Sequence, residues 1–567
     1  MTEPRTAKGT VSDVGRPEEL DVAIVGAGVA GLYSVYKLRG LGLRVRAFEQ
    51  GPDLGGTWYW NKYPGARCDV PSWDYSFSFS PELEQEWHWT ERYATQPEIL
   101  AYLNHTADRF NLRESIEFGV CVEHVHYDSD RARWRLSMDD GRVVVARYVV
   151  AASGILSTVN VPDIKGLDDF GGLVVHTGRW PQNGLDVSGL RVGLIGTGSS
   201  GSQVAPWLAE NADELYVFQR RPVYAVPAHH RAISDEEAAE VKRTYRERRA
   251  TAKYSPTGAP YPATDRCGTE VDDETFREVA EKAWAEGGIF AVQTCFADIA
   301  TSPETNERLS EFVRQKIAAK VEDPATAEAL VPVDYPLGAK RLVVEDGYYE
   351  VYNRSNVHLV SIKDTPIDHV SSAGIVVDGT TYDLDVIVFA TGFDAVSGSI
   401  FRMDVRGRDG RPMTDAWADG PTSYLGLSVP DFPNFFLVAG PGSPSAFSNL
   451  IDGIEHSLDY TTDLIEFAEK HNAPFIEAEP AATESWMDQV DMIAKATVYA
   501  DTDGWYNGTN IDGKARRWTA FLGGVGYYRE TLDDIAAKGY PGYRFGVEVE
   551  APSTARSDAD SQRVGVN

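Results

Sequence analysis

Cysteine and long apolar runs are scarce in this sequence. Its 567 residues include four cysteines, and no two of them have two or four residues between them. That spacing argues against a zinc site or a dithiol redox centre, so we predict no metal site and reduced thiols in a cytoplasmic protein. No run of about 18 apolar residues is present to cross a bilayer. Residues 1–20 lack the apolar core of a signal peptide, and neither export nor a membrane partner is expected.

Positive charge is also in short supply. The chain has 54 Lys and Arg against 85 Asp and Glu, a formal net charge of −31. Such acidity argues against nucleic acid as a partner and favours a small-molecule ligand. Any anionic cofactor must then be held by local basic residues, which makes single Arg and Lys residues informative. We expect a monomer or a weak homo-oligomer with more than one hydrophobic core, because 567 residues exceed one ordinary domain.

The first of two glycine-rich turns follows the apolar run DVAIV at 21–25. The turn Gly26-Ala-Gly28-Val-Ala-Gly31 leads into a helix-like stretch and a second apolar run that ends at Glu49. In a Rossmann-type unit the first glycine allows the tight turn, the second lets the backbone approach a pyrophosphate, and the third permits close helix–strand packing. The acid accepts ribose hydroxyls and repels a 2′-phosphate, so this unit is predicted to bind FAD or NAD rather than NADP.

The second turn repeats this pattern with the opposite charge at its end. RVGLIG leads into Gly196-Thr-Gly198-Ser-Ser-Gly201, and a helix and a strand follow. Arg220 stands where the first unit has its acid, and Arg221 is next to it. A cation there suits a 2′-phosphate, so this unit is predicted to bind NADPH. The alternative is that the two arginines only solvate the end of a strand.

Two further segments carry candidate ligands. The aromatic stretch GGTWYWNKYPGARCD at 55–69 is interrupted by Gly, Pro and charge, so it is predicted as a loop that covers a planar ring; core packing is the alternative. Arg67 and Asp69 would be costly to bury there without a partner or ligand. Lys340 and Arg341 are adjacent cations in an acidic chain and are candidate anion ligands, with a surface salt bridge as the alternative.

The chain is predicted to be α/β, with two Rossmann-like dinucleotide-binding domains, the second inserted in the first, and a helical insert. Two strands end in small residues, at 152–154 and at 390–392, as expected where a chain leaves one domain and later returns to it. The predicted boundaries are 20–154 and 385–545 for the FAD domain, 155–232 and 331–384 for the NADP domain, 233–330 for the helical insert, and 1–19 and 546–567 for disordered tails.

Between the two turns lies FGGLVVHTGRWP, residues 170–181, which matches the signature of type I Baeyer–Villiger monooxygenases. The stretch from Gly56 to Asp69 resembles the second signature of that family, and the resemblance covers roughly residues 20–545. Within the family the chain is most similar to the phenylacetone, steroid and acetone monooxygenase group, through segments such as WYWNKYPGARCD and AGPGSPSA.

The resemblance implies that NADPH reduces FAD and that reduced flavin and O₂ give a flavin peroxide, which converts aryl, cyclic or steroid-like ketones to esters or lactones. It makes Arg341 the stabiliser of the anionic species and Asp69 the carboxylate that orients it. Lys340 and Arg220 would hold the 2′-phosphate, and Trp505 would lie over the nicotinamide ribose. The signature histidine, His176, is implied to couple the domains rather than to transfer protons.

The site residues expected from these patterns and from the resemblance fall into four groups. The catalytic residues are Arg341 and Asp69. The cofactor-binding residues are Gly26, Gly28, Gly31, Glu49, Trp58, Arg67, Asp69, Tyr75, Thr197, Gly198, Ser199, Ser200, Gly201, Gln203, Arg220, Arg221, Lys340, Arg341 and Trp505. The signature residues of the linker are Phe170, Gly172, His176, Trp180 and Pro181. The substrate pocket is expected to include Ser445, Ala446, Phe447 and Leu450.

Three other functions compete with this interpretation. A flavin-dependent N- or S-monooxygenase is the nearest, but Trp180-Pro181 and Arg341 argue against it. A pyridine nucleotide–disulfide reductase is excluded by the missing cysteine pair. A non-catalytic protein that senses NADPH or FAD is the third alternative, and nothing in the sequence supports it while the candidate Arg–Asp pair is intact.

Overall fold

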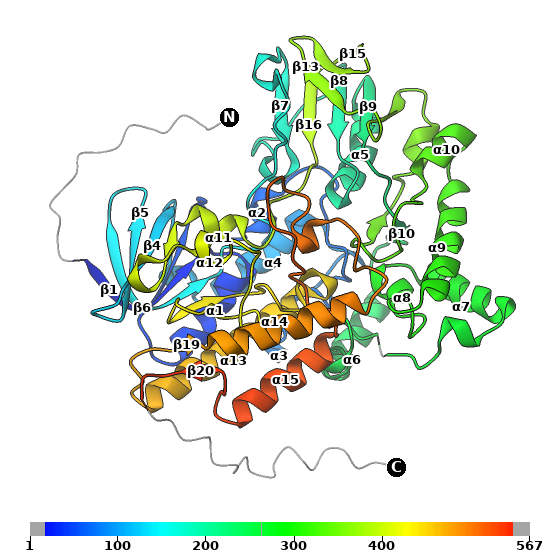
Figure 1. Cartoon of the computed structure of the whole chain (residues 1–567). Coiled ribbons are helices and arrows are strands. Elements are labelled where there is room, and N and C mark those ends of the chain that lie inside the picture. The colour runs from blue at the N-terminus through cyan, green and yellow to red at the C-terminus, as the bar shows by residue number, and fades with distance from the viewer. Residues whose placement is uncertain (1–16, 262, 548–567) are drawn as a thin grey trace.

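The structure, a computed structural model, describes residues 17–261 and 263–547. Two sheets form the two main bodies of the molecule (Figure 1). In each sheet, one strand leads through a glycine turn into a helix. The first strand begins at Glu18, where Glu18 and Glu19 pair with Val144 and Val145. The predicted tail to residue 19 is therefore two residues too long, because these glutamates are held by backbone pairing. Residues 17, 546 and 547 of the predicted tails are described as well, and the tail residues 1–16 and 548–567 lie outside the described residues.

The first sheet surrounds the first glycine turn. Its strands in the described chain are β1 (Glu18–Val25), β2 (Val45–Glu49), β3 (Ile116–Phe118), β4 (Val122–Asp128), β5 (Arg133–Met138), β6 (Val143–Ala151), β17 (Val405–Arg406) and β18 (Phe435–Leu437). β1 lies in the middle and runs parallel to both β2 and β6. β4, β5 and β6 form an antiparallel meander. The apolar run at 22–25 is buried on both faces, as is usual for a central parallel strand.

The second sheet surrounds the second glycine turn and is wholly parallel. Its strands are β7 (Leu173–His176), β8 (Arg191–Ile195), β9 (Glu214–Gln219), β12 (Val357–Ser361) and β16 (Val386–Phe389), in the order β12-β9-β8-β16-β7. β16 was predicted to belong to the first domain, which was placed from residue 385 onward. That boundary is wrong, because β16 pairs with β7 and β8 and the chain rejoins the first sheet only at β17.

Helices cover the sheets, and a group of them makes up the segment at 233–330. The described helices are α1 (Val29–Gly40), α2 (Thr57–Trp60), α3 (Pro81–Glu86), α4 (Gln96–Arg109), α5 (Ser199–Asn211), α6 (Asp235–Tyr254), α7 (Asp273–Glu286), α8 (Ile289–Gln293), α9 (Pro303–Ala318), α10 (Pro324–Leu330), α11 (Gly398–Arg402), α12 (Met413–Ala416), α13 (Leu450–Lys470), α14 (Pro480–Lys495) and α15 (Val525–Ala537). α6 to α10 occupy the segment at 233–330; α7 to α10 lie together on one side of the molecule, and α6 lies beside α15 (Figure 1). Small sheets complete the fold: β10 (Ala225–Pro227) with β11 (Val343–Glu345), β13 (Ile367–Val370) with β14 (Gly374–Val377) and β15 (Thr380–Asp383), and β19 (Glu477–Ala478) with β20 (Tyr543–Arg544).

Alternate residues of each central strand enter different cores. Val22 and Ile24 of β1 belong to the same large apolar cluster as Val192 and Leu194 of β8, and residues of the helical segment join it. The opposite face of the first sheet has a core of its own, and so does the opposite face of the second sheet. The shared core fixes the two glycine turns relative to each other, which positions the site between them.

The chain crosses between the two sheets twice, and the two crossings lie side by side. Val159 and Phe393 form an antiparallel bridge. Asn160 N–H donates to the Gly392 carbonyl at 2.9 Å, and the Asp394 N–H donates to the Thr158 carbonyl at 2.8 Å. The segments 155–160 and 391–396, which we call the crossing ribbon, therefore connect the sheets as one hydrogen-bonded pair.

Candidate active site

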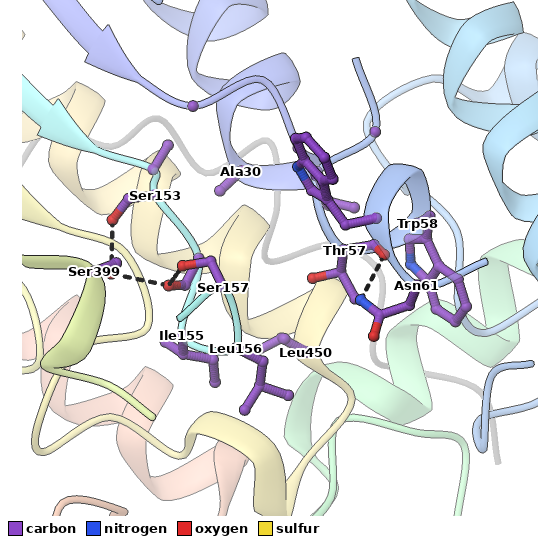
Figure 2. A pocket seen from close by; sticks show the side chains of 18 of the residues that line it. Ala30, Thr57, Trp58, Asn61, Ser153, Ile155, Leu156, Ser157, Ser399 and Leu450 are labelled. Atoms are coloured by element: carbon purple, nitrogen blue, oxygen red, sulfur yellow. Dashed lines mark hydrogen bonds between the residues drawn. The ribbon is translucent and has the colours of Figure 1, made fainter. Parts of the chain in front are cut away.

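An elongated cavity of about 580 Å³ begins at the first glycine turn and extends between the two sheets. Its walls come from the first turn, the aromatic loop at 55–69, the exit loop at 152–158, the start of α5, Arg341 and the start of α13. Figure 2 shows Thr57, Trp58 and Asn61 of the aromatic loop on one side and Ile155 and Leu156 of the exit loop on the other. The site is thus built from segments far apart in the sequence.

The two glycine turns share one construction. Gly26 has φ +104°, and a Cβ atom there would lie 2.6 Å from the Ala152 carbonyl oxygen; a Cβ on Gly31 would lie 2.0 Å from the carbonyl oxygen of Gly26 itself. In the second unit Gly196 has φ +106°, and a Cβ atom there would lie 2.5 Å from the Ala390 carbonyl oxygen. A Cβ on Gly201 would lie 2.2 Å from the carbonyl oxygen of Gly196. Any side chain at these four positions would displace backbone, so the predicted tight turn and close helix packing are present in both units.

Glu49, predicted to accept ribose hydroxyls, is buried at the end of β2 and lines the cavity. Its two carboxylate oxygens accept hydrogen bonds from the Ala27 N–H at 2.8 Å and the Gly51 N–H at 2.7 Å. Burial raises the pKa of Glu49, and the two backbone donors and Arg179 oppose that rise. The backbone bonds hold the carboxylate in one orientation at the edge of the first turn.

Arg341 and Asp69, 272 residues apart, form a two-pronged ion pair in the wall of the cavity. Arg341 Nε donates to Asp69 Oδ2 at 2.6 Å and Nη2 donates to Oδ1 at 2.7 Å. Their side chains are 18% and 21% exposed, so the pair is held where water competes weakly. The carboxylate of Asp69 raises the pKa of Arg341 above its usual value against the opposing effect of burial. The surface salt bridge considered from sequence is therefore ruled out, since this pair lines a cavity.

The aromatic loop joins the two bodies of the molecule. The Trp58 indole donates to the hydroxyl of Tyr75 at 3.2 Å, and both residues line the cavity. Gln203 of α5 donates to the Arg67 carbonyl at 3.1 Å and accepts from the Tyr63 hydroxyl at 2.8 Å. A Cβ on Gly65 would lie 2.3 Å from the Gln203 carbonyl oxygen, which explains a glycine at this contact.

Arg67 lines the cavity, but its guanidinium already has protein partners. Nη1 contacts Glu91 Oε2 at 3.1 Å and His230 Nε2 at 2.6 Å, and His230 also contacts Glu91 at 2.8 Å. The sequence offered no indication of this cluster, because its members are brought together only by the fold.

A cluster of cations lies outside the cavity wall and consists of Lys340, Arg220 and Arg221. Burial, followed by the charges of Arg221 and Arg220, lowers the pKa of Lys340 to about 8. The Lys340 ammonium lies 4.5 Å from the centre of the Tyr335 ring. Three cations held close enough to affect one another form a favourable place for an anion. Thr197 Oγ1 donates to the Arg221 carbonyl at 3.0 Å, which ties this cluster to the second glycine turn.

The signature segment is partly a strand rather than a simple linker. Residues 173–176 form β7, the edge strand of the second sheet, because they pair with β16. Gly172 is required there, since a Cβ would lie 2.3 Å from the Asp385 carbonyl, and Phe170 packs against the core of the second sheet. His176 is buried at the end of β7, where its Nδ1 accepts the Gly178 N–H at 2.9 Å and burial lowers its pKa to about 4.

Trp180 is buried, and its ring meets that of Trp207 on α5 edge-on. Pro181, next to it, is half-buried.

Several predicted residues line the cavity and others do not. The lining residues among those expected are Gly26, Gly28, Glu49, Trp58, Arg67, Asp69, Tyr75, Ser199, Gln203, Arg341, Leu450 and Trp505. The residues that lie outside its wall are Gly31, Thr197, Gly198, Ser200, Gly201, Arg220, Arg221, Lys340, Ser445 and Phe447. The Phe447 ring instead packs on the Tyr506 ring, with their centres 4.2 Å apart. The side chain of Ala446 lies outside the described residues.

Two cations in the wall were missed from sequence. Arg179 lies within the signature segment at a position that the motif leaves open, and Arg402 ends α11. A cation inside a motif of so acidic a chain was a usable indication for Arg179. Arg402 stands in a stretch without a recognisable pattern, so only the fold reveals it.

One group of three potential metal ligands occurs in the described part of the chain. The side chains of His124, His126 and Asp404 bring their donor atoms within 4.8 Å of one another, at the edge of the first sheet. Arg406 already pairs with Asp404 at 2.9 Å, and the two imidazoles contact the same carboxylate at 3.3 and 3.0 Å. A cation would compete with these contacts. The four cysteines are free thiols.

Comparisons with known proteins agree with this geometry. A family model described as pyridine nucleotide-disulphide oxidoreductase matches residues 20–244, the region of the two glycine turns. A Baeyer-Villiger monooxygenase of Pseudooceanicola batsensis is 41% identical over 92% of this chain and 95% of its own length. The solved structure of an oxidized steroid monooxygenase bound to NADP is 47% identical, with a TM-score of 0.88, over 93% of this chain and 99% of that one. The chain belongs to the Baeyer–Villiger monooxygenase family.

Family membership confirms the resemblance found in the signature and the predicted α/β fold with two dinucleotide-binding units. A solved relative, OTEMO in complex with FAD and NADP, has a TM-score of 0.90 at 38% identity, over 93% of this chain and all of that one. A phenazine N-monooxygenase of Lysobacter antibioticus is 40% identical over 92% of this chain and 96% of its own length. Identity alone therefore does not separate ketone oxygenation from N-oxygenation, and the residues of the site must do so.

Among the described residues, no helix is long and apolar enough to cross a membrane.

Proposed function

We propose that this Baeyer–Villiger monooxygenase uses FAD, NADPH and O₂ to insert one oxygen atom beside the carbonyl of a ketone, which gives an ester or lactone. The second oxygen atom leaves as water, and NADPH supplies the two electrons. The single observation that supports this reaction best is the Arg341–Asp69 pair in the wall of the cavity. Oxygen transfer to a carbonyl develops negative charge, and a fixed guanidinium stabilises that charge without losing its own proton.

The residues of the first unit fit FAD. Gly28 lines the cavity at the first turn, just before the start of α1, where backbone N–H groups could receive a diphosphate. Glu49 presents a carboxylate to the same end of the cavity, as required for ribose hydroxyls. When bound, FAD supplies the redox chemistry that activates O₂. Asp69 would orient Arg341 toward the reacting end of the cavity, and the aromatic loop would exclude water there.

The second unit is assigned to NADPH. A Cβ on Gly198 would meet nothing within 4 Å, so the turn is open to a ligand. Lys340, Arg220 and Arg221 would bind the 2′-phosphate, because their mutual repulsion is relieved by an anion. Trp505, in the cavity wall, would contact the nicotinamide half of the cofactor.

The substrate end of the cavity is apolar. Val70, Ile454 and Leu450 line it together with Ser448, whereas Ser445 and Phe447 pack behind this wall. An apolar pocket with one buried cation favours a hydrophobic ketone, so we assign aryl, cyclic or steroid-like ketones as the substrate class. A monomeric or weakly associated cytoplasmic enzyme remains the expectation from composition.

N-oxygenation is the second candidate, favoured by the identity to a phenazine N-monooxygenase. A nitrogen nucleophile needs a protonated oxygen donor rather than an anionic one, and a fixed cation beside the reacting atoms favours the anionic form. The Arg341–Asp69 pair therefore favours ketone oxygenation.

The purified yellow protein should be supplied with NADPH, air and a panel of phenylacetone, a steroid ketone, a cyclic ketone and phenazine. Ester or lactone from at least one ketone, with one NADPH consumed per product, is the expected result. NADPH oxidation with only N-oxide formed would assign the second candidate instead. Arg341→Ala should leave FAD reduction by NADPH intact and abolish ester formation.

A further inference from the structure

Arg179 places a cation of the signature segment in the wall of the flavin cavity. It lies three residues after His176 and directly before Trp180. Its Nη2 donates to the Ser157 carbonyl at 3.0 Å and its Nη1 to the Gly178 carbonyl at 2.8 Å. The guanidinium lies over the ring of Trp60, 4.6 Å from the ring centre. These three contacts fix its direction.

Arg402 brings a second cation to the same part of the cavity. Both arginines line it, and the positive charge of Arg402 lowers the pKa of Arg179 in addition to the effect of burial. The exit loop that Arg179 contacts and the segment that carries Arg402 meet at one carbonyl: Ser157 and Ser399 both donate to the Gly154 carbonyl, at 3.3 and 3.1 Å (Figure 2). The two guanidinium groups therefore belong to one wall.

Their charges are not balanced by the protein. Within residues 17–261 and 263–547, neither guanidinium has a carboxylate oxygen within 4.0 Å, although Glu49 lies close enough to raise the pKa of Arg179. Both carboxylate oxygens of Glu49 are already hydrogen-bonded to backbone N–H groups. Arg179 is half-buried and Arg402 is exposed, and an anion between two such cations would relieve their mutual repulsion.

We propose that Arg179 and Arg402 form a clamp for the FAD diphosphate at the adenosine end of the cavity. The proposal rests on the assignment of FAD to the first unit. Glu49 marks the adenosine ribose and Gly28 the diphosphate turn, and the clamp lies on the wall next to Glu49. A planar guanidinium stacked on Trp60 is suited to two-pronged contacts with phosphate oxygens.

The clamp gives the signature segment a direct contact with FAD. Arg179 ends the short turn that follows β7 of the second sheet, whereas the turn that receives the diphosphate belongs to the first sheet. Bound FAD would therefore contact both bodies, with Arg179 as one of the contacts from the second.

The test measures binding of three ligands to the full-length protein after removal of FAD. FAD, ADP and adenosine are titrated by calorimetry into the wild type, Arg179→Gln, Arg402→Gln and the double variant. Arg243→Gln is the matched control, since Arg243 is an exposed residue of α6 paired with Glu240 and its loss changes the net charge equally. Circular dichroism checks that each variant is folded.

Loss of a charge-assisted contact should weaken ADP and FAD binding about tenfold or more in each single variant. The double variant should be weaker still. Adenosine, which has no phosphate, should bind all variants equally, and raising the salt concentration should weaken ADP binding less in the double variant than in the wild type. Arg243→Gln should match the wild type throughout.

Unchanged ADP affinity in both single variants would overturn the clamp. An equal loss of adenosine and ADP affinity would overturn it as well, because it would show a supporting role for the ribose pocket without any contact to phosphate. Arg402 is exposed, so Arg402→Gln keeps the test decisive if Arg179→Gln does not fold. A wild-type protein that binds neither FAD nor ADP would instead refute the FAD assignment.

Discussion

Replacing Asp69 by Asn tests the central pair with the smallest change of shape. The carboxylate accepts two hydrogen bonds from Arg341, at 2.6 and 2.7 Å. Asn keeps one acceptor oxygen but turns an NH₂ group toward the other guanidinium nitrogen, so one bond is lost and the negative charge with it. Arg341 then remains in the wall of the cavity without its fixed orientation.

The size of the effect follows from the burial of the pair. Removing one partner of a fully buried ion pair costs about 3–5 kcal/mol. The two side chains are 18% and 21% exposed, so water compensates in part and about 3 kcal/mol is expected. If Arg341 must be returned to its position for each oxygen transfer, that cost appears in the barrier. Since about 1.4 kcal/mol corresponds to a tenfold change in rate, ester formation should slow by about a hundredfold.

Two measurements separate this effect from a general loss of function. The anaerobic rate of FAD reduction by NADPH should change less than threefold, a margin that corresponds to roughly 0.6 kcal/mol. The ester formed per NADPH oxidised should fall steeply, because oxygen transfer is the step that needs Arg341. Circular dichroism and FAD content serve as controls for folding.

A near-normal rate of ester formation by Asp69→Asn would refute the reasoning, since it would show that Arg341 holds its position without the carboxylate. An equal loss in reduction and in ester formation would also count against it. That result would place Asp69 in cofactor binding alone.

Three further predictions concern the second unit and the signature. Arg220→Gln should raise KM for NADPH at least tenfold while KM for NADH stays within twofold; an unchanged ratio of the two would contradict the 2′-phosphate assignment. The pKa of Lys340 lies near 8, so its charge is lost as the pH rises through 8; kcat/KM for NADPH should fall there, and Lys340→Arg should remove that fall. A pH profile in which Lys340→Arg falls like the wild type would exclude this lysine. The low pKa of His176, about 4, keeps the imidazole neutral at working pH, so His176→Asn should reduce ester formed per NADPH without moving the pH profile between about pH 6 and 8; a shift would indicate proton transfer.

The sequence predicted the turns well because their chemistry is local. Gly26 and Gly196 are needed where the backbone has positive φ and meets a neighbouring carbonyl, and such requirements leave a pattern in consecutive residues. The boundary at 385 failed for a related reason. Ala390 lies against Gly196 as Ala152 lies against Gly26, so each unit has its own small-residue exit. The two exits look alike in sequence, and only strand pairing tells which sheet each belongs to.

The site could be predicted in part. Arg341 and Asp69 came from the resemblance, and their pairing depends on a fold that brings residues 272 positions apart into contact. The partners of Arg67 come from segments separated by 24 and 163 residues and left no pattern. Ser445 and Phe447 were expected in the pocket wall, but neither lines the cavity: Ser445 is buried and the Phe447 ring packs on that of Tyr506.

The crossing ribbon has a mechanical consequence. A single tether lets one body swing, slide and spin relative to another, whereas two antiparallel tethers bonded along their length resist sliding and spinning. The ribbon therefore adds its resistance to sliding and spinning to the packing of the shared core, which already holds the two glycine turns in place. Cutting one strand of it would leave the other in place, so the second body would remain attached and docked after a single nick.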